Sequence, residues 1–197
     1  MILLAPYIHP TADISAQAQI GAGTHIAAQA QVREFAIIGE RCDIGKGVYI
    51  DAHVHIGSHV RIQNHVSLYE GVTIDDGVFI GSQVSFTNDM FPRAINLDGT
   101  PKGVYDWDVT ATHIEYGASL EAGAVVRCGV SIGRFALIGA GAVVTRDVDA
   151  HALVVGNPAR PHGYVCRCGF LLERVRMRDG RRLAFCPRCD REYDITP

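Results

Sequence analysis

Four cysteines near the C-terminus are spaced in a way that can bind a metal ion. They form two short pairs, Cys166-Arg-Cys168 and Cys186-Pro-Arg-Cys189. Four thiolates make a closed tetrahedral ligand set for zinc, so such a site is structural rather than catalytic. The second pair has the usual spacing, and the first is one residue shorter. Because Asp179-Gly180 predicts a hairpin turn between the pairs, we expect a zinc-ribbon-like tail over residues 162–197.

The composition is that of an ordinary folded protein, with 48% hydrophobic and 20% charged residues. The net charge of −3 argues against broad binding to nucleic acids, although the tail from Tyr164 onward carries eight arginines against five acidic residues. Aromatic residues interleaved with basic ones are sparse there, so nucleic acid is not expected as a partner. No apolar run approaches the roughly 20 residues that span a bilayer, and we expect a cytoplasmic protein without a membrane partner.

A six-residue repeat dominates the chain before the tail. Every sixth residue from Ile8 to Phe86 is a large apolar one, and the apolar pattern returns from Ile114 to Ala150. The fourth residue after each is small or valine. Fourteen hexads precede the gap and seven follow it. A period of six fits neither an amphipathic helix nor a single alternating strand.

A hexad period is typical of a solenoid in which each hexad supplies a short strand and a turn. Three hexads close one triangular coil, and equivalent positions stack from coil to coil. We therefore predict an all-β fold, a parallel β-helix of seven coils over residues 1–161, with the large apolar side chains in its interior.

The repeat is interrupted once. The spacing between Phe86 and Ile114 is not a multiple of six, and the segment between them has no hexad signal. It contains Pro92, Pro101 and the only tryptophan, Trp107. We expect a loop over residues 88–113 to leave the solenoid. A long loop on a rigid scaffold is a frequent place for binding and catalysis, although it could also serve only to pack on a neighbouring subunit.

The hexads resemble those of the hexapeptide-repeat acyltransferases. This resemblance implies a left-handed parallel β-helix, a homotrimer, and acetyl-CoA bound in a groove between neighbouring prisms. A closer resemblance is carried by the run from Arg61 to Ala94, with its FTN and PR elements, and by Gly139 to Arg160. These runs are similar to nucleotide-sugar N-acetyltransferases that modify a 3-amino group, such as the one acting on UDP-2-acetamido-3-amino-2,3-dideoxy-glucuronate. The implied activity is acetyl transfer from acetyl-CoA to a UDP- or dTDP-linked amino sugar, in the synthesis of cell-surface polysaccharide precursors.

The same resemblance implies which residues form the site. Asn88 corresponds to the asparagine at the acceptor amine. His65 lies in the same motif run and is expected close to Asn88 in the stack, and with Asp89 it completes the candidate catalytic group. The acceptor is expected to contact Gln63, Asn64, Tyr69, Glu70, Phe86 and Arg93. Acetyl-CoA is expected beside Gly139, Gly141, Arg146, Asn157, Pro158 and Arg160. That family commonly has asparagine where this chain has His65, and the loop here differs in length, so the identity of the sugar stays open.

The residue after Asn88 bears on the type of acceptor. Many hexapeptide acetyltransferases use a histidine as the proton acceptor, and some relatives have it directly after the asparagine, where this chain has Asp89. A hydroxyl acceptor needs such a base, whereas a neutral amine is already nucleophilic and can react once it is oriented. The absence of histidine here favours an amine acceptor. Asp89 could be a weak base or a turn residue.

Other functions remain open at this point. His53, His59 and His65 recur at the hexad period, so one chain places them on three different sides of a coil, and a metal site would need two subunits, as in the γ-class carbonic anhydrases of the same fold. Sugar O-acetylation would need a histidine base, for which His65 is the candidate. A non-catalytic solenoid that only mediates assembly is the alternative from another class.

Overall fold

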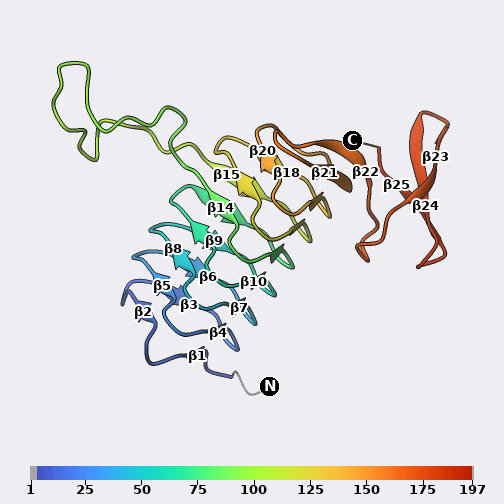
Figure 1. Cartoon of the computed structure of the whole chain (residues 1–197). Coiled ribbons are helices and arrows are strands. Elements are labelled where there is room, and N and C mark those ends of the chain that lie inside the picture. The colour runs from blue at the N-terminus through green and yellow to red at the C-terminus, as the bar shows by residue number, and fades with distance from the viewer. Residues whose placement is uncertain (1–3, 197) are drawn as a thin grey trace.

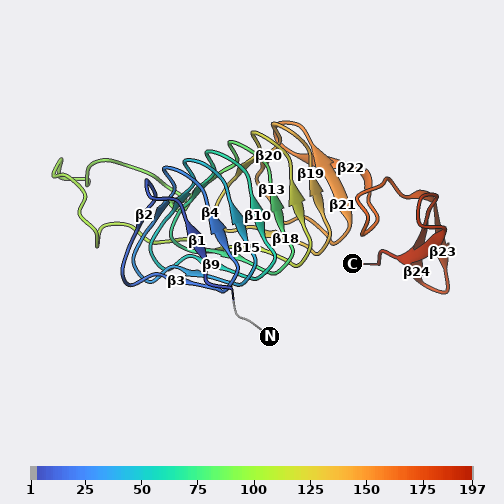
Figure 2. The ribbon, with the colours of Figure 1, turned by 90° about the horizontal axis from the view of Figure 1, so that it is seen from below.

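The computed structural model describes residues 4–196, and the described residues form strands and turns without a helix. Three parallel sheets make the faces of a triangular prism (Figures 1 and 2). Sheet A contains β1 (Tyr7–Ile8), β4 (His25–Ile26), β7 (Asp43–Ile44), β10 (Arg61–Ile62), β13 (Phe79–Ile80), β16 (Ser119–Leu120), β19 (Leu137–Ile138), β21 (Ala152–Val155) and the antiparallel β22 (Arg160–Tyr164). Sheet B contains β2 (Asp13–Ile14), β5 (Gln31–Val32), β8 (Tyr49–Ile50), β11 (Ser67–Leu68), β14 (Ser85–Phe86), β17 (Val125–Val126) and β20 (Val143–Val144). Sheet C contains β3 (Gln19–Ile20), β6 (Ile37–Ile38), β9 (His55–Ile56), β12 (Val72–Ile74), β15 (Thr112–Ile114) and β18 (Ser131–Ile132).

The turns between these sheets form three corners, which we call AB, BC and CA after the sheets that they join. Many of the turns hold a residue in the left-handed backbone region, for example His53, His59 and His65 at φ of 58°, 59° and 58°. Since His53 follows sheet B, His59 follows sheet C and His65 follows sheet A, the three histidines stand on three different corners. This confirms their predicted separation within one chain.

Parallel pairing repeats every three hexads, as the sequence predicted. Ile44 pairs with Ile26 and with Ile62, and all three side chains are buried in the prism. Full burial of such a side chain stabilises the fold by about 1.5–3 kcal/mol. The fold is the left-handed parallel β-helix of hexapeptide repeats, as the resemblance implied.

The predicted loop interrupts one coil. Ile80 pairs with Leu120, although the residue three hexads after Ile80 lies inside the loop, so the insertion lengthens this coil well beyond the others. The loop leaves after β14 and returns at β15, and Figure 1 shows it extending away from the stack. Because β15 begins at Thr112, the loop ends earlier than the expected residue 113.

The last coil departs from the hexad register. Ile132 pairs with Val148, and Ile138 pairs with Val154, in each case two positions short of three hexads. Val148 and Val154 therefore take the interior strand positions, and Ala150 is a half-buried turn residue. The expected interior position of Ala150 was wrong because this coil is shorter than the others.

The tail begins by folding back on the solenoid. β22 pairs with β21, so the expected boundary between residues 161 and 162 falls inside a strand. Beyond it, β23 (Glu173–Arg178), β24 (Arg181–Cys186) and β25 (Arg191–Asp194) form an antiparallel sheet with a small apolar cluster of its own. His151 links the two parts, because its carbonyl accepts from the Val165 amide at 2.7 Å and its ring stacks on Phe135.

Candidate functional site

The loop leaves the prism at the BC corner and is closed at its base by backbone hydrogen bonds. The Thr110 amide donates to the Asn88 carbonyl at 2.8 Å, which joins the outgoing and returning strands of the loop. Further out, the Lys102 amide donates to the Ala94 carbonyl at 3.0 Å. These contacts bring residues that are distant in sequence to the two sides of one cavity.

This cavity, of about 460 Å³, is the first candidate for an acceptor site. Its lining residues are Asn88, Asp89, Arg93, Ala94, Lys102, Gly103, Val104 and Trp107. An amide, two cationic side chains and an indole ring therefore surround one space, which suits a ligand with an anionic part and a planar ring. The structure brings Asn88, Asp89 and Arg93 together. Lys102 and Trp107 were not among the predicted site residues, although Trp107 is the only tryptophan of the chain.

Asp89 has a local structural role. Its Oδ1 accepts a hydrogen bond from the Phe91 amide at 2.8 Å, the geometry of an aspartate that stabilises a turn. Of the two roles open for Asp89, this contact favours the turn residue.

Tyr69 and Glu70 lie on the same BC corner, one coil before Asn88. The Tyr69 ring packs against Tyr49 at 5.7 Å between centroids, and Tyr49 donates to Asp51 Oδ1 at 2.9 Å. Asp51 Oδ2 also accepts from the Glu70 amide at 3.3 Å. Burial and the neighbouring Asp51 carboxylate raise the pKa of Tyr49. Tyr69 remains 38% exposed and can contact a ligand beside the loop.

Three predicted residues stand on a different corner. Gln63, Asn64 and His65 form the AB turn between β10 and β11, on the other side of sheet B from Asn88. Asn64 uses its Oδ1 to accept from the Lys46 amide at 2.9 Å, and the His65 ring covers Gly47 of the preceding coil. The expected proximity of His65 to Asn88 within one chain was wrong, because the two residues belong to different corners.

Phe86 does not line a site. Its side chain is 0% exposed and points into the prism, since the first apolar position of every hexad faces the interior. The expectation that Phe86 binds the acceptor was wrong for this reason.

The residues expected beside acetyl-CoA separate into two places. Gly139 and Gly141 lie in the last AB turn, and the exposed Asn157 and Pro158 follow β21 at the same end. Open space surrounds Gly141, so a ligand can approach its backbone closely.

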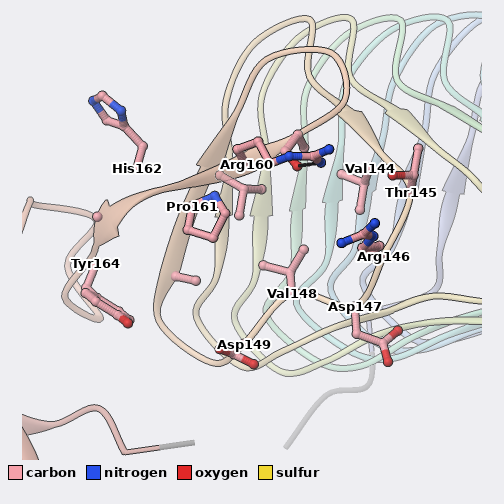
Figure 3. A pocket seen from close by; sticks show the side chains of 14 residues that line it. Val144, Thr145, Arg146, Asp147, Val148, Asp149, Arg160, Pro161, His162 and Tyr164 are labelled. Carbon is pink, nitrogen blue, oxygen red and sulfur yellow. Dashed lines mark hydrogen bonds between the residues drawn. The ribbon is translucent and has the colours of Figure 1, made fainter.

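Arg146 and Arg160 share a hollow of about 310 Å³ at the C-terminal end of the prism. Figure 3 shows both side chains beside this hollow, together with Val144 and Val148. Apolar walls with two guanidinium groups suit a ligand that carries both an apolar chain and phosphates.

The four cysteines converge in the tail. Their sulfur atoms all lie within 4.8 Å of one another, and Sγ–Sγ distances are 3.8 Å for Cys166 and Cys189 and 3.7 Å for Cys168 and Cys186. Four sulfurs at about 2.3 Å from a tetrahedral zinc lie about 3.8 Å apart, so the cluster fits this ion. Within residues 4–196 it is the one group of three or more candidate ligands close enough to share a metal.

The cluster also has the electrostatics of a cation site. Burial disfavours a charged Cys166, yet hydrogen bonds from the Cys168 amide and the Tyr193 hydroxyl lower its pKa to about 7. A hydrogen bond between the Cys189 thiol and Cys168, together with burial, favours the protonated form and raises the pKa of Cys189 to about 12. A divalent cation at the centre of the cluster would favour the deprotonated form of all four thiols.

Family models match most of the solenoid. The model of the bacterial transferase hexapeptide matches residues 17–52 and 53–88, and the hexapeptide repeat of succinyl-transferase matches residues 112–146. Together these ranges span more than half of the 197 residues. The chain belongs to the hexapeptide-repeat transferases.

Two curated relatives that the chain matches in part are acetyltransferases. The chain is 53% identical over 57 residues to dTDP-3-amino-3,6-dideoxy-alpha-D-galactopyranose 3-N-acetyltransferase of Aneurinibacillus thermoaerophilus, covering 29% of this chain and 30% of that enzyme. It is 35% identical over 86 residues to serine acetyltransferase 4 of Arabidopsis thaliana, covering 44% of this chain and 22% of that enzyme. The matched part thus spans less than a third of either relative.

Among solved structures, the chain is similar to a hexapeptide-repeat acetyltransferase of Vibrio cholerae complexed with acetyl coenzyme A. The two share 26% identity over 63% of this chain and 68% of that one, with a TM-score of 0.53.

None of the described residues forms a helix long and apolar enough to cross a membrane.

Proposed function

We propose that this protein transfers an acetyl group from acetyl-CoA to the amine of a nucleotide-linked amino sugar, a UDP- or dTDP-linked 3-amino sugar. The observation that carries the proposal is the convergence of Asn88, Arg93, Lys102 and Trp107 on one cavity at the base of the loop. The local 53% identity to an N-acetyltransferase of a dTDP-3-amino sugar supports the choice of substrate class.

Each group in the cavity has a task in this reaction. The Asn88 amide can accept from the attacking amine and hold its lone pair toward the thioester carbonyl, which is the orientation that the reaction needs. Arg93 and Lys102 provide the positive charge that a diphosphate or a sugar carboxylate requires in a protein of net charge −3. Trp107 offers a face on which a pyrimidine base can stack.

Acetyl-CoA supplies the thioester, and its binding is assigned to the C-terminal coils. Arg146 and Arg160 would hold its phosphates beside the hollow that they line. Gly141, with the exposed Asn157 and Pro158, would let the extended pantetheine arm approach the backbone, whereas Gly139 is buried against Val155 and would support this turn from within.

The split of the site between two corners supports a homotrimer with sites between subunits. Within one chain, Asn88 lies at corner BC and the other candidate catalytic residue, His65, lies at corner AB. If both contact the same ligand, His65 must come from a second prism. The loop also exposes large apolar side chains: Phe91 is 81% exposed, and Leu97 and Tyr105 are almost completely exposed. Apolar surface of this extent on an extended loop is expected to be covered by a neighbouring subunit.

We assign a structural zinc ion to Cys166, Cys168, Cys186 and Cys189. The tail is too small to bury a sufficient core, and its apolar cluster includes two of these ligands, Cys166 and Cys186. A closed set of four thiolates leaves no position for substrate, so the ion supports the fold of the tail. Reduced thiolates and a CoA-dependent reaction both suit the cytoplasm.

The test is an assay of CoA release from acetyl-CoA with UDP- and dTDP-linked 3-amino and 4-amino sugars and their hydroxyl counterparts. Turnover on one amino sugar, reduced at least about 100-fold by Asn88→Ala, is the expected result. Asn96→Ala serves as a matched control, since Asn96 lies in the outer loop, where its side chain bonds to Thr100 and Asp106.

Two outcomes would overturn the proposal. Turnover on a hydroxyl sugar alone, lost in His65→Ala and kept in Asn88→Ala, would assign O-acetylation. A trimer that neither binds acetyl-CoA in calorimetry nor releases CoA with any acceptor would assign an assembly role.

A further inference from the structure

One strand belongs both to the hollow assigned to acetyl-CoA and to the connection with the tail. β22 contributes five consecutive residues, Arg160 to Tyr164, to the lining of this hollow, and residues 144–159 supply the rest. Because β22 is the edge strand of sheet A, it pairs with β21 alone among the described strands. Pro161 also lacks the amide that a strand residue can donate. The hollow therefore keeps its shape only while this edge strand stays in place.

The tail holds the end of this strand. The Tyr164 carbonyl accepts from the Leu172 amide at 2.8 Å, and the Tyr164 hydroxyl accepts from Arg182 Nη1 at 2.5 Å. Tyr164 also packs against the apolar cluster of the tail, which includes Cys166 and Cys186. Figure 3 shows its side chain at the end of β22, beside the hollow that it lines. Tyr164 therefore belongs both to the hollow and to the folded tail.

Arg182 reaches Tyr164 from a strand that carries a zinc ligand. It lies in β24, which ends at Cys186. Residues just after β25 hold its backbone, since the Ile195 amide donates to the Arg182 carbonyl and the Arg182 amide donates to Thr196 Oγ1, both at 2.8 Å. Arg182 is not among the residues that line the hollow. Its contact with Tyr164 therefore depends on the fold of the tail.

The prism and the tail have separate apolar cores. The core of the prism is continuous from coil to coil, whereas the cluster of the tail consists of Cys166, Leu172, Ala184, Cys186 and Ile195. So small a core does not stabilise a fold by itself, and a metal ion bound to cysteines supplies the missing free energy. Loss of zinc should therefore unfold the tail and leave the prism folded. β22 would then lose the contacts that hold its end.

We propose that the zinc-loaded tail completes the acetyl-CoA site by holding β22, and that Arg182 is a positioning residue that acts through Tyr164; this inference rests on the proposed function. With zinc bound, β22 lies along β21 and closes the hollow. Without zinc, β22 is released and one side of the hollow is lost. Because acetyl-CoA binds these two states with different affinity, zinc and acetyl-CoA must each strengthen the binding of the other by the same factor.

The first test measures acetyl-CoA binding by calorimetry on the full-length protein, zinc-loaded and after removal of zinc by a chelator. Couplings between sites are typically about 5- to 150-fold, so the zinc-free protein should bind acetyl-CoA at least about tenfold more weakly. Added zinc should restore the affinity. Arg182→Met should keep its zinc and the wild-type melting temperature, yet bind acetyl-CoA about 2- to 30-fold more weakly.

Arg178→Met is the matched control. Arg178 is exposed at the end of β23 in the same hairpin, and its Nε lies 3.7 Å from the Asp179 carboxylate instead of contacting Tyr164. This variant should bind acetyl-CoA with wild-type affinity. Wild-type affinity in Arg182→Met as well would refute the positioning role of Arg182.

The second test measures the reverse effect on protein that starts zinc-loaded. Zinc transfer to a competing chelator is followed with and without acetyl-CoA, which is used instead of CoA because a free thiol would itself bind zinc. Acetyl-CoA should strengthen zinc retention in the wild type by the factor found in calorimetry, and by a smaller factor in Arg182→Met.

Three outcomes would overturn the inference. If acetyl-CoA binds the wild type with the same affinity with and without zinc, the coupling is refuted and the acetyltransferase proposal stands. A loss of affinity without the reciprocal effect on zinc retention would also refute the coupling, because it would reflect damage to the zinc-free protein. If the zinc-loaded wild type does not bind acetyl-CoA at all, both proposals fail.

Discussion

Phe86 provides a quantitative test of whether a residue close to the site contributes to the stability of the prism or to ligand binding. It lies close before Asn88 in the chain, yet its ring is fully buried in β14, paired in register with Val126. Truncation to alanine removes the ring and leaves a cavity in a closed stack, which costs about 3–5 kcal/mol. In a chain of this size each kcal/mol lowers the melting temperature by about 2–4 °C, so we expect Phe86→Ala to melt about 6–20 °C lower.

The assay combines thermal melting at fixed protein concentration with the KM of the acceptor sugar. Phe86→Leu, which keeps an apolar side chain, should melt between wild type and Phe86→Ala and leave KM unchanged. Phe35→Ala is the control, because Phe35 is 47% exposed and only stacks on His53, so about 1 kcal/mol or less is at stake. A core role of Phe86 would be refuted if Phe86→Ala melted at the wild-type temperature, or if Phe86→Leu raised KM without lowering the melting temperature.

Three further predictions concern the tail and the end of the prism. One zinc ion per chain should be measured by metal analysis, and Cys189→Ser should lose it together with the protease resistance of residues 162–197; zinc retained by Cys189→Ser would refute the assignment. Burial lowers the pKa of His151, so its contribution to stability is present above the unfolded pKa of about 6.5 and is lost as the pH falls below it. Denaturant melts at pH 7.5 and 5.5 should therefore show a smaller pH effect in His151→Gln than in wild type, and an equal effect would contradict the burial argument. Arg160→Ala should raise the KM for acetyl-CoA at least about tenfold and leave the KM of the sugar unchanged, because one charge-assisted contact is lost. If the variant and the wild type have the same KM for acetyl-CoA, the cofactor binds away from Arg160.

The fold could be predicted from the sequence because every coil repeats the same local structure, a short strand and a turn in each hexad. Apolar residues one hexad apart, such as Ile44, Ile50 and Ile56, each face the interior from a different sheet, so the period alone specifies three faces and their stacking. The cysteine pairs were equally informative, since few chemical roles other than metal binding suit two close pairs in a short tail. The shortened last coil was missed because Ala150 continues the apolar pattern although Val148 and Val154 take the strand positions.

The site was only partly predictable. Sequence patterns alone predicted a triangular prism, a loop that leaves it after Phe86, and an asparagine at the base of that loop. It could not show that Lys102 and Trp107 return to the Asn88 cavity, because the path of a loop without a repeat depends on its own contacts. The separation of His65 from Asn88 likewise depends on which corner each turn occupies, which a motif read along the chain does not reveal.

The pairing of Asp75 with His113 shows why tertiary structure was needed. In an uninterrupted hexad solenoid, neighbours in the stack are three hexads apart, whereas these two residues are separated by the whole inserted loop. The insertion shifts the register between β12 and β15, so that Val72 pairs with Thr112 and residues before and after the loop meet at a spacing that the repeat does not predict. Local periodicity determined the scaffold, while closure of the coil around the inserted loop decided which side chains meet at its base.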